Sequence, residues 1–161
     1  MEHQADVIIV GTGVAGLFCA LQLPKELHIL MITKDKAEHS DSYLAQGGIS
    51  TLRTPEDYES YFEDTMRAGH YKNNPDSVDV MIRSSPQIIQ NLIDFGVEFE
   101  RTSDGLSYTR EGAHSTFRIL HHKDITGYEI TSKLMAQVQQ RPYIQIEEYT
   151  SMVDIIEQNH V

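Results

Sequence analysis

A short apolar strand, followed at once by a glycine-rich turn and an apolar helix, constrains the fold of this chain more than any other stretch. Residues 7–10 are four consecutive apolar residues, which predicts a buried parallel strand. Gly11, Gly13 and Gly16 then form a Gly-x-Gly-x-x-Gly pattern. The first glycine allows the tight turn, the second lets a pyrophosphate approach the backbone, and the third lets the helix pack against the strand.

The start of this helix is also an anion site in general terms, because its first N–H groups have no partner within the helix and the helix dipole is positive there. The stretch therefore predicts a dinucleotide site, and the alternative is a tight turn that binds nothing. The residues predicted to contact the dinucleotide here are Gly11, Gly13, Val14, Ala15 and Gly16.

Composition excludes several classes of protein. The 161 residues carry 13 basic and 24 acidic side chains, a net charge of −11, and no run of basic residues, so nucleic acid is not an expected partner. No apolar run approaches the ~18 residues of a membrane span, and no signal peptide is recognised. Cys19 is the only cysteine, which fits a reducing, cytoplasmic compartment. We expect Cys19 to be a small buried apolar residue on the first helix.

A second apolar strand, Leu27 to Ile32, completes a βαβ unit with an expected right-handed crossover. A typical NAD or FAD site has Asp or Glu at the end of this strand, where it binds the ribose. Here Thr33, Lys34 and Asp35 follow instead, with no acid at the expected place. Three interpretations stay open: an NADP 2′-phosphate site, an FAD site that lacks the acid, and a Lys34 that is merely solvated.

The stretch Ser40 to Ser50 is too polar and too rich in glycine for a regular core element. Ser40, Ser42 and Gln46 offer neutral hydrogen-bonding groups, and Gly47-Gly48 permits close backbone approach. Such groups suit the amide-like edge of a flavin, but a surface loop explains them equally well.

Hydrophobic periodicity and capping residues predict the remaining elements. They are helices from Thr54 to Gly69, from Asn74 to Ser85 and from Pro86 to Gly96, a short strand at 97–99, a turn at 103–105, a helix from Thr126 to about Arg141, and strands at 143–149 and 152–156 in a small sheet. The helices before residue 100 interrupt the βαβ pattern, so we interpret them as an insertion.

Ionisable side chains are dense between residues 108 and 124. His114, His121 and His122 suggest a metal centre, but their spacing fits no ligand pattern and no acid or thiol stands at a supporting interval. We therefore predict no metal site.

Four motifs occur in order: the glycine turn, Ser40 to Ser42 with Ala45-Gln46-Gly47-Gly48, Arg110 to Ser115, and Asp124-Ile125-Thr126-Gly127. This set resembles the flavoprotein family of succinate dehydrogenase, fumarate reductase and L-aspartate oxidase, most of all its L-aspartate oxidase branch. The resemblance implies FAD, with the Ala45–Gly48 loop around the flavin, and Thr33 and Lys34 are typical of that branch. The implied cofactor contacts beyond the glycine turn are Thr33, Lys34, Ser40, Ser42, Ala45, Gln46, Gly47 and Gly48.

Two positions separate the branches in this resemblance. Asp41 stands where the dehydrogenase branch attaches FAD through a histidine, so the resemblance implies non-covalent FAD. Glu111 stands where dicarboxylate enzymes have an apolar residue, and its carboxylate suits the ammonium of an amino-acid substrate. The alternative is a surface ion pair of Glu111 with Arg110 or Arg118. The implied substrate-side residues are Glu111, Arg110, His114 and Thr126.

The implied reaction is the oxidation of L-aspartate to iminoaspartate, with dioxygen or fumarate as the final acceptor. The product would serve quinolinate synthase and hence NAD synthesis. The alternatives are a soluble fumarate reductase or succinate dehydrogenase flavoprotein fragment, and a nucleotide-binding fragment without catalysis.

The predicted fold is α/β, a Rossmann-like βαβ core with a helical insertion and a small sheet, incomplete relative to the family. We divide it into residues 1–50 (βαβ and flavin loop), 54–100 (helical insertion) and 106–161 (substrate-side loop, helix and strands). The capping and helical domains of the family have no counterpart, so we expect an N-terminal piece that is inactive alone.

Overall fold

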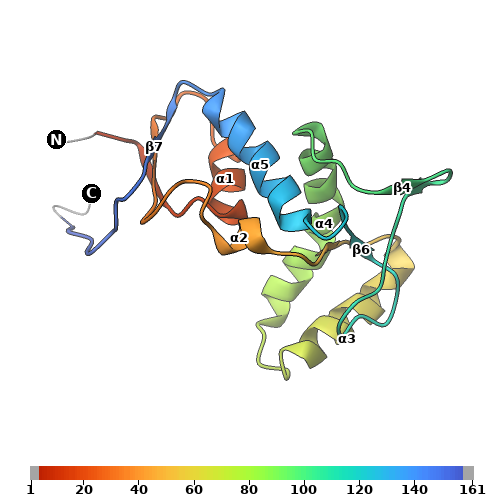
Figure 1. Cartoon of the computed structure of the whole chain (residues 1–161). Coiled ribbons are helices and arrows are strands. Elements are labelled where there is room, and N and C mark those ends of the chain that lie inside the picture. The colour runs from red at the N-terminus through yellow and green to blue at the C-terminus, as the bar shows by residue number, and fades with distance from the viewer. Residues whose placement is uncertain (1–3, 158–161) are drawn as a thin grey trace. The chain divides into compact units, whose positions relative to one another are not determined.

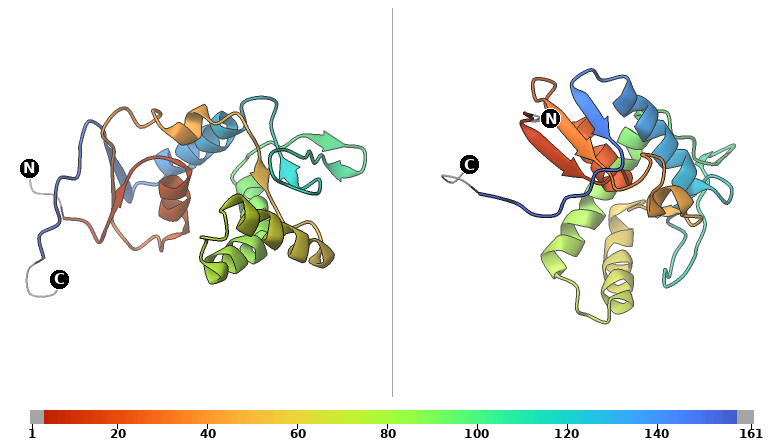
Figure 2. Two further views of the ribbon diagram at one scale, coloured as in Figure 1. Left: turned by 90° about the horizontal axis from the view of Figure 1, so that it is seen from below. Right: turned by 60° about the vertical axis from the view of Figure 1, so that its left-hand side comes forward.

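Three parallel strands form the sheet that the opening motif predicts (Figure 2). In the computed structural model, which describes residues 4–157, the strands are β1 (Val7–Val10), β2 (Ile29–Ile32) and β7 (Ile144–Glu147). Their order is β1-β2-β7, with Val7 opposite Ile29 and Ile29 opposite Ile144. Helix α1 (Val14–Gln22) connects β1 to β2, as the sequence predicts.

The sheet differs from the sequence prediction at both of its edges. β1 is an edge strand on which Ile8 is 60% and Val10 53% exposed, so it is not the buried strand predicted from its apolar run. Within this sheet only the central strand β2 is buried along its whole length, because it has a neighbour on each side. The predicted strand at 143–149 joins this parallel sheet rather than a separate one, and residues 152–157 form no strand. Cys19 is exposed and is not the buried residue expected.

The chain groups into two compact units, one of Met1–Leu44 with Ile130–Val161 and one of Ala45–Glu129. The first holds the parallel sheet and α2 (Asp41–Leu44), a short helix in the stretch predicted to be irregular. In the second, β3 (Ile49–Ser50) pairs with β6 (Ile119–Leu120), and β4 (Arg101–Thr102) forms a hairpin with β5 (Gly105–Leu106). The hairpin turn is the one predicted at 103–105, whereas residues 97–99, predicted to be a strand, are irregular, with Val97 and Phe99 buried and Glu98 exposed.

Two helices build the core of the second unit (Figure 1). A 3₁₀ turn, η1 (Pro55–Asp57), precedes α3 (Tyr58–Ala68), and α4 (Pro75–Asp94) follows. Tyr61 and Met66 of α3 pack against Val78 and Ile82 of α4.

Helix α4 is continuous through Pro86, where the sequence predicts a break. Proline removes the N–H that would bond to the carbonyl four residues earlier. The hydroxyl of Ser85 donates to that carbonyl, Ile82 O, at 2.7 Å, so the freed acceptor keeps a partner. The same hydroxyl accepts the Leu52 N–H at 2.8 Å, which ties α4 to the β3 segment.

Helix α5 (Thr126–Gln139) begins where predicted and buries Ile130, Leu134 and Val138 on one face. None of the helices in residues 4–157 is long and apolar enough to cross a membrane.

Candidate functional site

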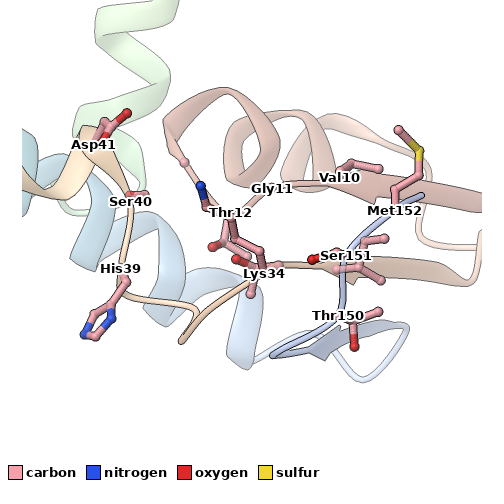
Figure 3. A pocket seen from close by; sticks show the side chains of 13 residues that line it. Val10, Gly11, Thr12, Lys34, His39, Ser40, Asp41, Thr150, Ser151 and Met152 are labelled. Carbon is pink, nitrogen blue, oxygen red and sulfur yellow. The ribbon is translucent and has the colours of Figure 1, made fainter. Parts of the chain in front are cut away.

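A pocket of about 400 Å³ lies at the carboxyl ends of the three parallel strands (Figure 3). Gly11 follows β1, Thr33 and Lys34 follow β2, and Thr150–Met152 follow β7. In open α/β sheets, ligands bind in the crevice outside the carboxyl ends of the strands. The position of this pocket is therefore that of a ligand-binding crevice, and its lining lies wholly within the first unit.

The glycine turn has the geometry that the motif predicts. Gly11 has φ +105°, a backbone conformation that residues with a Cβ rarely adopt, and its N–H continues the sheet by donating to Ile32 O at 2.8 Å. A Cβ on Gly16 would lie 2.2 Å from Gly11 O and 3.2 Å from Ile9 Cγ2. Gly16 is thus required for the close packing of α1 on β1.

Gly13 and Val14 meet a side chain rather than open space. The Ser42 hydroxyl, on α2, accepts the Val14 N–H at 3.2 Å, and a Cβ on Gly13 would lie 3.0 Å from Ser42 Oγ. Ser42 therefore already contacts the helix start that the sequence assigns to phosphates. The phosphate contacts of Gly13, Val14 and Ala15 stay predictions.

The polar groups of the pocket are of mixed charge. Lys34 is an exposed cation in the lining, and Ser40 and Asp41 lie at the start of α2. His39 also lines the pocket, and its Nδ1 lies 3.1 Å from Asp35 Oδ2. This hydrogen bond lowers the pKa of the Asp35 carboxyl below its ordinary value.

Sequence reasoning missed the contribution of residues 150–152. The apolar residues from Met152 onward suggested a strand, whereas Thr150 and Ser151 come three and four positions after the end of β7 at Glu147 and line the pocket. Their placement depends on backbone bonds after β7: Thr33 N donates to Glu147 O at 2.9 Å, and Thr150 N donates to Thr33 O at 2.8 Å.

The other predicted cofactor residues, Ala45–Gly48, lie in the second unit with the predicted substrate residues. Ala45 O accepts the Gly127 N–H at 2.9 Å, next to the start of α5. A Cβ on Gly48 would lie 2.3 Å from Ile119 Cγ2 on β6, so only glycine fits there. Gly47 is open, and its nearest side-chain neighbour is a carboxylate: a Cβ built on Gly47 would lie 3.9 Å from Glu111 Oε2.

Glu111 is exposed and does not form the surface ion pair considered from the sequence. Within residues 4–157, Arg118 pairs with Asp57 and Asp64, and the Arg110 guanidinium lies 5.7 Å from the ring centre of Phe117. The Glu111 carboxylate thus stands beside the Gly47-Gly48 segment with neither arginine bound to it.

The remaining predicted residues have local partners. His114 is half-buried, and its Nδ1 lies 3.1 Å from Arg118 Nη1. Thr126 is 2% exposed, and its hydroxyl accepts the His122 N–H at 3.0 Å, which attaches the segment before α5 to the first residue of that helix. Among residues 4–157 no group of three His, Cys, Asp or Glu side chains is arranged to hold a metal ion.

Comparison with known proteins gives a family match and related sequences. Residues 6–161 match the family model of the FAD binding domain. The chain is 47% identical over 155 residues to an L-aspartate oxidase of Clostridium perfringens, covering 96% of this chain and 35% of that protein. It is 45% identical to an L-aspartate oxidase of Clostridium acetobutylicum, covering 100% of this chain and 37% of that protein. The chain thus spans about a third of the length of these relatives.

Solved structures share the fold. E. coli quinol fumarate reductase superposes with a TM-score of 0.85 at 30% identity, over 92% of this chain and 26% of that one. A flavocytochrome c3 fumarate reductase gives a TM-score of 0.84 at 19% identity, over 96% of this chain and 28% of that one, which shows the fold alone. The α/β fold, partial relative to these flavoproteins, and the resemblance inferred from the motifs are both confirmed.

Proposed function

The chain belongs to the FAD binding domain family, and from that premise we propose that it binds FAD non-covalently as part of an enzyme that oxidises L-aspartate to iminoaspartate. The pocket at the carboxyl ends of β1, β2 and β7 fits the nucleotide end of FAD, because Gly11 opens the backbone and Lys34 supplies a cation. Asp41 supports non-covalent binding, since a carboxylate cannot form the histidyl link of the dehydrogenase branch.

Bound FAD would supply the acceptor for two electrons and the Cα hydrogen of the substrate. The contribution of this chain is recognition of the substrate amine. The observation that carries the proposal is the Glu111 carboxylate, which lies beside Gly47 and is bound to neither Arg110 nor Arg118. A charge-assisted hydrogen bond from the substrate ammonium to this carboxylate would favour aspartate over succinate.

FAD binding is tested by titrating the chain into FAD and following the quenching of flavin fluorescence. Gly11→Ala should abolish quenching, because alanine is strained at φ +105°. Gly105→Ala is the matched control, since Gly105 has φ +125° and open space around it but lies in the β4–β5 hairpin. Binding that survives Gly11→Ala, or is lost equally in both variants, contradicts the proposed pocket.

The choice of substrate is tested with the FAD-loaded protein expressed from its gene. Hydrogen peroxide release is measured with aspartate and with succinate. Glu111→Gln should raise the KM for aspartate by tenfold or more, because a hydrogen bond to a charged group contributes about 1.5–3 kcal/mol. The proposal is wrong if Glu111→Gln leaves the KM for aspartate unchanged.

A fumarate reductase or succinate dehydrogenase flavoprotein is the second candidate, favoured by the superposition on the E. coli enzyme. Turnover of succinate but not aspartate would establish it.

We place the iminoaspartate product upstream of quinolinate and NAD synthesis, with dioxygen or fumarate reoxidising the flavin. Absence of FAD binding would leave a fragment without catalysis.

A further inference from the structure

Arg118 is the largest fully buried side chain in the described residues, at 0% exposure, and all its N–H donors are used. Its Nε donates to Asp57 Oδ2 at 3.1 Å, and its Nη2 donates to Asp57 Oδ1 at 2.7 Å and to Ser60 Oγ at 2.6 Å. Its Nη1 lies 2.7 Å from Asp64 Oδ2 and 3.1 Å from His114 Nδ1. The five donors of a guanidinium thus meet five acceptors.

The contact of Arg118 Nη1 with His114 Nδ1 determines the tautomer of His114. Arginine has no acceptor and stays protonated, so an imidazole nitrogen that bonds to it must carry a lone pair. Nδ1 of His114 is therefore unprotonated, and the proton of the neutral ring is on Nε2. Protonating the ring would place an N–H opposite the guanidinium and remove one of its acceptors.

The surroundings of His114 act in the same direction. Burial of the ring and the charge of Arg118 lower the pKa of His114, against the smaller opposing effects of Asp64 on α3 and Asp57 in η1. The ring of Tyr61, also on α3, lies edge-on at 5.7 Å. His114 is thus a neutral imidazole that accepts from Arg118 at Nδ1 and carries its proton on Nε2.

The same contacts hold the turn that carries Glu111. The His114 N–H donates to Glu111 O at 3.2 Å, across Gly112 with φ +55°. Asp64 accepts the Ser115 N–H at 2.6 Å and the Ser115 hydroxyl at 2.7 Å. Ser115, which follows the turn, therefore attaches it to Asp64 on α3. The His114 ring attaches the same turn to Arg118.

We propose that Arg118, held between Asp57 and Asp64, is a positioning residue that fixes His114 as the neutral Nε2–H imidazole and sets the turn that carries Glu111. Its importance for substrate recognition rests on the proposed role of Glu111. The tautomer and the turn do not, because they are properties of the chain without cofactor or substrate.

Nuclear magnetic resonance of the ¹⁵N-labelled chain, with no FAD or aspartate added, tests the proposal. Long-range imidazole spectra, assigned with His114→Gln, should show an unprotonated Nδ1 and a protonated Nε2. The titration midpoint of the ring should lie below about 6.5, the ordinary value for histidine. A coupling across the hydrogen bond should connect Arg118 Nη1 to His114 Nδ1.

A proton on Nδ1, or a midpoint at or above the ordinary value, overturns the proposal, and so does the absence of the coupling. All three are measured on the unaltered chain, so they decide the matter even where a variant does not fold. A failed FAD titration together with the expected spectra would instead contradict the proposed function and leave this inference standing.

Variants separate positioning from stability. Arg118→Lys keeps the positive charge but removes the planar set of guanidinium N–H donors. In the folded variant, His114 should therefore populate both tautomers. Ser60→Ala is the matched control, since it removes one partner of Arg118 and leaves His114 untouched. It should lower the melting temperature without changing the His114 spectrum. An unchanged spectrum in folded Arg118→Lys would show that Arg118 is merely structural.

Discussion

Asp64→Asn should destabilise the chain by about 3 kcal/mol, because it removes one of the two carboxylates paired with the buried Arg118 and leaves the buried guanidinium only partly compensated by Asp57. Asp64 is 3% exposed. Its Oδ2 accepts from Ser115 N, Ser115 Oγ and Arg118 Nη1, and its Oδ1 accepts from Arg67 Nη2 at 2.6 Å. An amide keeps one acceptor oxygen, but it cannot neutralise Arg118, and its NH₂ faces donors. The loss is large against a typical total stability of about 5–15 kcal/mol.

Urea denaturation followed by far-ultraviolet circular dichroism measures this loss as a shift in midpoint at constant m-value. Asp79→Asn is the matched control, because Asp79 also pairs with an arginine, Arg83, at 2.8 Å, but its side chain is 38% exposed. Solvent-exposed pairs contribute about 0–1 kcal/mol. The reasoning fails if Asp64→Asn costs less than about 1 kcal/mol, or no more than Asp79→Asn.

Three further predictions follow from named contacts. The Asp57 and Asp64 carboxyls have pKa values below their ordinary range, set by hydrogen bonds and the charge of Arg118 against the opposing effect of burial; their stabilisation is therefore present above about pH 4, the unfolded value, and is lost as the pH falls through the folded pKa. The melting temperature, recorded from pH 6 downward, should begin to decrease once the pH is below about 4. The decrease should be less steep in Asp64→Asn. Gly48→Ala should lower the free energy of unfolding by about 2 kcal/mol or more, because the added Cβ would lie 2.3 and 2.4 Å from atoms of β6. Gly47→Ala should leave the free energy of unfolding, measured by urea denaturation, nearly unchanged, because its nearest contact would be at 3.9 Å. Gly16→Ala should lower the melting temperature and weaken FAD quenching together, because its Cβ would lie 2.2 Å from a carbonyl oxygen of the glycine turn; a stable Gly16→Ala chain that binds FAD normally would contradict the assigned packing role.

The elements with strong local signals were predictable from the sequence. The apolar run before Gly11, the Asn74 cap and the Gly96 stop are decided by residues within one or two turns of each other, and each stands where predicted. Asn74 Oδ1 accepts the Ser77 N–H at 3.1 Å, as its position before Pro75 implies. The family likewise follows from motifs that are local in sequence.

Three of the failures depend on contacts that local propensities do not specify. Whether β1 is buried depends on how many strands flank it, and the sheet order makes it an edge. Whether Pro86 breaks a helix depends on the hydroxyl of Ser85, whose own position is held by Leu52. Residues 150–152 reach the pocket only because β7 pairs with β2 rather than with a neighbour in sequence.

The amino-acid sequence by itself therefore determined the glycine turn, the helix α1 that follows it, the family and the candidate residues Glu111 and His114. Only the tertiary structure decided what those residues are bound to. It shows that Arg118 is occupied by Asp57 and Asp64, separated from it by 61 and 54 positions in the chain, and is thus not a partner for Glu111. Local propensities cannot encode such a pairing, because the charge of an arginine is satisfied by whichever carboxylates the folded chain brings to it.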